Sequence, residues 1–156
     1  MSRVPRRGAV LLAAVLVVGG SLTGCESAAQ KKAEHDFEQA ADLSTCKADA
    51  TAADTPYGDG FPDDWPFPPQ TTVFNAEDRG ADGTIVTGIS SSSFKDILAV
   101  MNGPVVDAGY KVDKGETEEH DAEAEWEGNG FRGRWAIRES AQCPSETVIQ
   151  VLSTDE

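Results

Sequence analysis

One stretch of the chain, residues 121–138, reads DAEAEWEGNGFRGRWAIR and predicts a β-hairpin. Apolar and charged residues alternate on both sides of Gly128, Asn129 and Gly130, which is typical of two strands that share one buried face. Asn129-Gly130 favours a two-residue type I′ turn, because both positions of that turn require a positive φ. Such a turn allows one register, so it determines every cross-strand pair.

The predicted register agrees with the side chains in both size and charge. On one face, large residues lie opposite small ones in the pairs Trp126 with Gly133, Ala124 with Trp135, and Ala122 with Ile137. On the other face, acids lie opposite arginines in the pairs Glu127 with Arg132, Glu125 with Arg134, and Asp121 with Arg138. Exposed ion pairs contribute under about 1 kcal/mol each. We therefore interpret the acid-arginine ladder as a solvated face and not as a ligand site.

The flanking sequence predicts four more strands. They are expected over Thr71 to Asn75, Thr84 to Ser90, Tyr110 to Glu118 and Thr147 to Ser153, with a turn at 76–83 closing the first two into a hairpin and a loop at 139–146. The strand from Tyr110 is weakly specified, whereas the last is apolar on both faces. A helix is expected between the second and third of these segments. Without the weakly specified strand from Tyr110, the predicted order is β-β-α-β-β-β. Short links predict an α+β domain, with one helix packed on an antiparallel sheet.

The helix is expected after the serines at 90–93. Its apolar face consists of Phe94, Ile97, Leu98, Met101, Val105 and Ala108. Ser92 or Ser93 can cap the first turn, and Gly109 can end the helix. Pro104 cannot donate a hydrogen bond to the preceding turn, so we expect a kink or break there.

Composition sets limits on function. The 156 residues include 13 Lys and Arg against 27 Asp and Glu, for a net charge of −14, and the length suits one small domain. Nucleic-acid binding requires clustered basic residues, so nucleic acid is excluded as an expected partner. The acidity also argues against direct docking of the domain on anionic lipids.

The N-terminus has the features of an export signal. Arg3, Arg6 and Arg7 precede the apolar run from Ala9 to Val18, which is too short to span a bilayer as a helix. Leu22-Thr23-Gly24-Cys25 follows, and this motif resembles the lipobox of bacterial lipoprotein signal peptides. The resemblance covers residues 1–25. It implies cleavage after residue 24 and attachment of a diacylglycerol to the Cys25 thiol; the alternatives are an ordinary cleaved signal or an uncleaved anchor.

Residues 25–60 are expected to be an acidic tether between the signal peptide, 1–24, and a domain at 61–156. Large apolar residues are sparse in the tether, and too few to form a core. A short helix is predicted over Ala28 to Leu43, where Phe37, Ala40 and Ala41 have helical spacing.

Phe61 to Pro69 alternates aromatic residues with prolines, which predicts an extended segment. Two interpretations are open. Trp65 and Phe67 could contact a partner protein, or the segment could cover its own domain. The second is favoured, because a small domain needs those rings to complete its core.

The remaining cysteines, Cys46 and Cys143, form an even pair once Cys25 is lipidated, and we expect a disulfide between them in an oxidising compartment. A redox or metal role is less consistent with the sequence, which has no Cys-x-x-Cys. The histidines, His35 and His120, are flanked by acids and are interpreted as surface residues.

No catalytic residue, metal site or cofactor is predicted, because nucleophile and phosphate-loop motifs are absent from the sequence. Residues 78–83 resemble part of a calcium loop but lack two of its ligands, and are interpreted as a hairpin turn. The leading hypothesis is a lipid-anchored, non-catalytic domain at the outer face of the cell membrane that binds an envelope protein or a small ligand. The alternatives are a structural accessory of an envelope complex and, less favoured, an enzyme using surface carboxylates.

Overall fold

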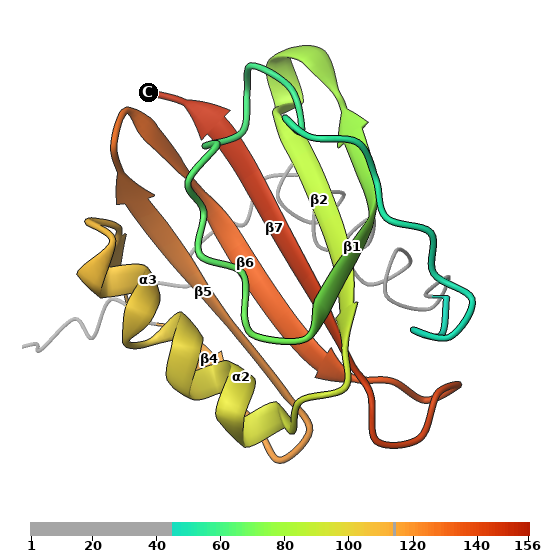
Figure 1. Ribbon diagram of the computed structural model, residues 1–156. Coiled ribbons are helices and arrows are strands. Elements are labelled where there is room, and N and C mark those ends of the chain that lie inside the picture. Colours follow the sequence, from blue (N-terminus) through green and yellow to red (C-terminus); the bar gives the residue numbers. More distant parts are fainter. Residues whose placement is uncertain (1–44, 114) are drawn as a thin grey trace, which may run out of the picture.

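The computed structural model describes residues 45–113 and 115–156 and has an α+β architecture, as predicted (Figure 1). The elements are β1 Thr71–Asp78, the 3₁₀ turn Gly80–Asp82, β2 Thr84–Ser90, α2 Phe94–Met101, α3 Pro104–Asp107, β3 Lys111–Val112, β4 Glu116–Thr117, β5 Asp121–Gly128, β6 Phe131–Glu139 and β7 Thr147–Asp155. The predicted helix over Ala28 to Leu43, the signal segment and Cys25 lie outside the described residues.

The strands form one antiparallel sheet in the order β1-β2-β7-β6-β5-β3, with β4 also paired to β5. The last strand of the chain therefore lies at the centre of the sheet (Figure 1). This position explains why β7 is apolar on both faces: Val148, Ile149 and Val151 are all buried.

The β5–β6 hairpin has the predicted register. Trp126 lies opposite Gly133, and Asp121 lies opposite Arg138. Asn129 and Gly130 have φ values of 55° and 85°, which are the positive values that a type I′ turn requires. Turn chemistry and side-chain complementarity thus specify the same pairing.

The first hairpin is also present, and β1 is longer than expected. Pairing continues past Asn75 to Asp78, which lies opposite Thr84. The turn follows immediately: the Asp78 Oδ1 accepts a hydrogen bond from the Gly80 N–H at 2.7 Å. The hairpin interpretation of residues 78–83 is therefore confirmed.

The predicted helix is divided into α2 and α3 at Gly103-Pro104, as expected from the proline. Ser93 caps α2, because its Oγ accepts a hydrogen bond from the Asp96 N–H at 3.2 Å. Ile97, Met101 and Val105 are fully buried. The prediction for Ala108 is wrong: it is exposed, since it lies after the break and beyond the end of α3.

The single strand predicted over 110–118 is instead two short strands, β3 and β4, both paired with β5. Val112 lies opposite Trp126, but Glu116 lies opposite Glu123, so the register shifts by one residue between them. Gly115 makes this possible, because a Cβ there would lie within 2.6 Å of the Ala124 Cβ.

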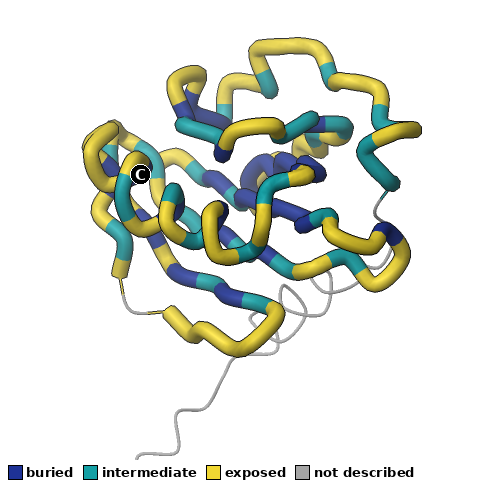
Figure 2. The backbone as a smooth tube through the Cα atoms, turned by 60° about the horizontal axis from the view of Figure 1, so that its bottom comes forward, coloured by how far each residue is buried: buried dark blue, intermediate teal, exposed yellow. Residues whose placement is uncertain are grey.

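The two faces of the sheet differ in the elements that pack on them. The helix face carries α2 and α3, whose buried side chains join one core cluster with Val86, Trp126, Trp135, Ile137, Ile149 and Val151. The second face carries the alternate residues of the same strands. Figure 2 shows buried backbone positions concentrated in the central strands, with exposed positions in the turns.

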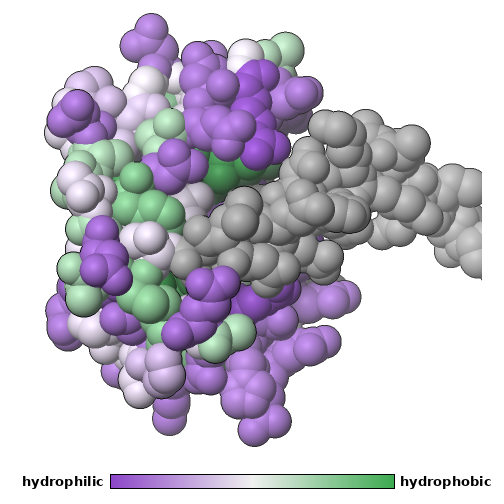
Figure 3. All heavy atoms as spheres, turned by 90° about the vertical axis from the view of Figure 1, so that its right-hand side faces the viewer, coloured by the Kyte–Doolittle hydropathy of each residue, from purple (hydrophilic) through white to green (hydrophobic). Residues whose placement is uncertain are grey.

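Segment 45–60, expected to be part of the tether, contacts the domain at several points. Cys46 forms a disulfide, the Ala53 N–H donates to the Val73 carbonyl at 2.9 Å, and Tyr57 packs against the core cluster. Figure 3 shows the side of the molecule that lies on the right in Figure 1, where hydrophobic surface alternates with hydrophilic residues. Within the described residues, this segment is thus already joined to the domain at Cys46.

Candidate functional site

The aromatic strip, residues 61–69, belongs to the core of the helix face. Trp65 is 5% exposed, and its ring centroid lies 4.5 Å from that of Trp126 and 4.9 Å from that of Tyr110. Phe67 is half-buried and stacks on the buried Phe61. A ring as buried as Trp65 has no free surface for a partner, so its contacts favour the interpretation that the strip covers its own domain.

Hydrogen bonds hold this strip at both of its ends: the Ser90 Oγ on β2 donates to the Pro69 carbonyl at 3.0 Å, and Asp64 is bound by the residue that precedes β3. The Tyr110 hydroxyl donates to the Asp64 Oδ1 at 2.6 Å, while the Tyr110 ring packs edge-on against Trp126. Burial, together with this hydrogen bond, raises the pKa of Tyr110 to about 12. Burial also raises the pKa of Tyr57, which contacts Phe61 and Phe67.

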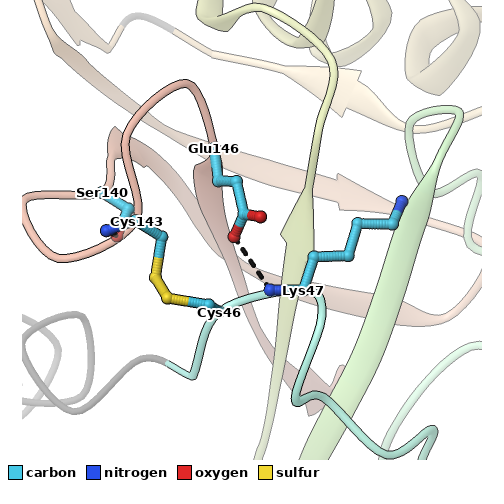
Figure 4. The surroundings of a disulfide bond; sticks show 5 residues. All are labelled: Cys46, Lys47, Ser140, Cys143 and Glu146. Carbon is cyan, nitrogen blue, oxygen red and sulfur yellow. Dashed lines mark hydrogen bonds between the residues drawn. A yellow bond between two sulfur atoms is a disulfide. The ribbon is translucent and has the colours of Figure 1, made fainter.

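A second junction joins Cys46 and Lys47, near the start of the described residues, to Cys143 and Glu146 in the loop before β7 (Figure 4). Cys46 and Cys143 form the predicted disulfide, with their Cα atoms 5.5 Å apart. Beside it, the Lys47 N–H donates to a Glu146 carboxylate oxygen at 2.8 Å, and the Cys143 N–H donates to the Ser140 Oγ at 3.0 Å. The disulfide therefore ties the chain entering the domain to the loop that leads into β7.

This junction also contains a group of three potential metal ligands within residues 45–113 and 115–156, namely Cys46, Cys143 and Glu146, whose ligand atoms lie within 4.8 Å of one another. Metal binding by cysteine requires a free thiolate. Because the two sulfurs are bonded to each other, the oxidised group offers one carboxylate and no thiolate. The geometry fits a covalent staple.

On the second face, β5 and β6 form a charged half that consists of Asp121, Glu123, Glu125, Glu127, Arg132, Arg134 and Arg138. Arg138 pairs with Asp121 at 3.6 Å, directly across the strands as predicted. Arg134 pairs with Glu123, a diagonal neighbour. Both partners in each pair are at least 26% exposed, so water screens these charges.

The charged half continues to the edge of the sheet. The Lys111 Nζ contacts Glu127 at 2.8 Å and Asp113 at 3.2 Å, and hydrogen bonds to these two carboxylates raise the pKa of Lys111. His120 lies at the start of β5, where its Nδ1 is 2.9 Å from a Glu139 oxygen, and its side chain is 66% exposed. The interpretation of His120 as a surface residue is confirmed.

The other half of the second face is apolar. It consists of Ile85 and Ile89 on β2 and Val148 and Leu152 on β7, with Thr87 and Gln150 between them. Ile89 and Val148 are opposite each other and are 0% and 2% exposed. None of these six residues belongs to the core cluster of the helix face.

At the centre of this apolar half, Gln150 is 2% exposed, and its amide Nε2 has no hydrogen-bond partner among residues 45–113 and 115–156. An unsatisfied buried donor costs about 1–3 kcal/mol. Sequence reasoning missed this surface, although its signal was present in the last strand, where both alternating sets of residues are apolar. That pattern indicated burial on both faces, but not what covers the second.

Comparisons with known proteins gave no match to a protein-family model, to a curated protein or to a solved structure. In the described part of the chain, no helix has the length and hydrophobicity needed to cross a bilayer.

Proposed function

We propose that this protein is a lipid-anchored, extracytoplasmic binding domain, held at the outer face of a bacterial cell membrane through Cys25. The observation that carries the proposal is the combination of a lipobox-like Leu22-Thr23-Gly24-Cys25 with the Cys46–Cys143 disulfide in one chain. Disulfides persist in oxidising compartments, to which an exported lipoprotein is delivered. The disulfide thus supports export independently of the signal sequence.

The arrangement of charges supports binding over catalysis. Catalytic acids and bases need a sheltered position beside a second orienting group, where their pKa values can be tuned. The carboxylates in the ion pairs described above lie on an open face and are at least 38% exposed. This charged surface suits electrostatic steering of a partner protein.

The anchor is tested by replacing Cys25. Cys25→Ala should abolish incorporation of a labelled fatty acid and leave a larger precursor, because both modification and cleavage require that thiol. Cys46→Ala is the matched control and should be labelled as strongly as wild type. Equal labelling of Cys25→Ala would contradict the anchor.

Binding is tested by affinity capture from detergent-solubilised envelope. We expect a specific protein to be recovered with wild type and reduced at least about tenfold with Glu125→Lys, which reverses charge on the second face. Asp107→Lys, on exposed α3, is the control. A partner retained at fixed stoichiometry through both variants would instead favour a structural accessory of an envelope complex. Recovery of no protein would contradict a protein partner.

A further inference from the structure

We propose that residues 28–43 of this chain form a helix that packs on the apolar half of the second face. The starting observation is that Ile85, Ile89 and Val148 are at most 5% exposed. The described helices and the aromatic strip join the core on the opposite face of the sheet. The apolar half therefore needs a cover of its own, since an open sheet face would leave these side chains in water.

The chain enters the domain at the right place to supply that cover. Cys46 is bonded to Cys143 in the loop that leads into β7, and the Lys47 N–H is held by Glu146. Val148 and Ile89 lie at this same end of the sheet. Residue 43 is thus attached a few residues from the surface, and such a short connection gives a high effective concentration.

The length and pattern of the segment also fit. A helix over Ala28 to Leu43 would be about 24 Å long, against about 30 Å for the nine residues of β7. Ala33, Phe37, Ala40 and Ala41 share one side of such a helix, with charged residues elsewhere. The small alanines allow close approach to a flat sheet, and Phe37 supplies one large ring for the apolar half.

The consequence for anchoring rests on the proposed function. With a lipid on Cys25, only Glu26 and Ser27 would separate the lipid from the packed helix. The domain would then be held close to the bilayer with the apolar half of the second face against its own tether, and the charged half of that face would remain available to partners.

Photo-crosslinking in the full chain identifies the occupant. p-Benzoylphenylalanine replaces Leu152, which is half-buried on the second face; the matched control replaces Val106, which is 46% exposed on α3. We expect a crosslink from position 152 to a peptide within 28–43 of the same chain, and none to that peptide from position 106. A product at twice the chain mass, or one joined to another protein, would show a different occupant and overturn the proposal.

Hydrogen exchange gives a second measurement that needs no unnatural residue. Amides of residues 28–43 should exchange at least about a hundredfold more slowly than in an unstructured peptide. Phe37→Asp should remove most of that protection, whereas Lys32→Asp, on the other side of the helix, should retain it. Unprotected amides in wild type would overturn the proposal. The same results are expected with Cys25→Ala, so a failed anchor and a failed packing are distinguishable.

Discussion

The two faces of this sheet are built from the same strands but have different chemistry. On the helix face, Trp126 and Trp135 pack with α2, α3 and the aromatic strip in one continuous core. On the second face, exposed ion pairs of β5 and β6 adjoin the apolar half on β2 and β7. Neighbouring residues such as Ile137 and Arg138 therefore belong to different environments.

The position of a strand in the sheet, and not its sequence alone, therefore decides whether each of its faces is buried or solvated. β5 is near the sheet edge and alternates between a buried and a solvated face, whereas the central strand β7 is buried on both. A domain of this size has enough chain after residue 60 to cover one face. Both described α-helices, α2 and α3, pack on the helix face and leave the second face to other cover.

The largest expected effect is on the helix face. Trp126→Ala should lower the free energy of unfolding by about 3–5 kcal/mol, because it leaves a cavity against Trp65 and Tyr110. Glu125→Ala, one residue away on the second face, should change it by less than about 0.5 kcal/mol. Urea denaturation of both variants checks this, and similar losses in the two would break the contrast between faces.

Removal of the staple should have the next largest effect. Replacing both Cys46 and Cys143 by Ala should cost about 2–4 kcal/mol, since the disulfide closes a loop with a sequence separation of 97. The helix-face core should survive, so near-ultraviolet circular dichroism from the tryptophans should change little. Loss of that signal would mean that the staple holds both faces together.

Stability at alkaline pH tests the hydrogen bond from Tyr110 to Asp64, which holds the aromatic strip on the helix face. Tyr110 has a pKa of about 12 in the folded protein, above its ordinary value of 10.0, so the unfolded chain loses this proton first. Stability should therefore be fully present below pH 10 and fall as the pH rises towards 12. Tyr110→Phe should cost about 1 kcal/mol at neutral pH and flatten the fall.

Denaturation series at several pH values test this behaviour. Tyr57 remains in the variant and also has a raised pKa, so the difference between wild type and Tyr110→Phe is the informative quantity. Parallel pH profiles for the two proteins would contradict the assignment.

The smallest effect is expected in the charged half of the second face. Arg138→Ala should cost less than about 1 kcal/mol and the loss should shrink in high salt, because its pair with Asp121 is exposed. Ile137→Ala, its neighbour on the helix face, should cost about 2–5 kcal/mol at any salt concentration. A large, salt-independent loss for Arg138→Ala would show that this half is covered too.

Much of the fold could be predicted because its signals are local. Asn129-Gly130 determined the turn and hence every pair between β5 and β6, while Pro104 determined the break between α2 and α3. The division of the predicted strand at 110–118 into β3 and β4 could not be predicted from such local signals. It depends on the close approach of Gly115 to Ala124 across the sheet, a contact that alternation alone does not reveal.

The sequence by itself determined the class of the fold and the register of the β5–β6 hairpin, because both follow from neighbouring residues. It also predicted the pairing of Cys46 with Cys143, because assigning Cys25 to the lipobox-like motif leaves two cysteines. Only the tertiary structure decided that β7 lies between β2 and β6 and that Trp65 belongs to the core. The physical reason is that such contacts join residues distant in sequence. Their free energy depends on the competing ways of burying the same apolar surface, which no local pattern specifies.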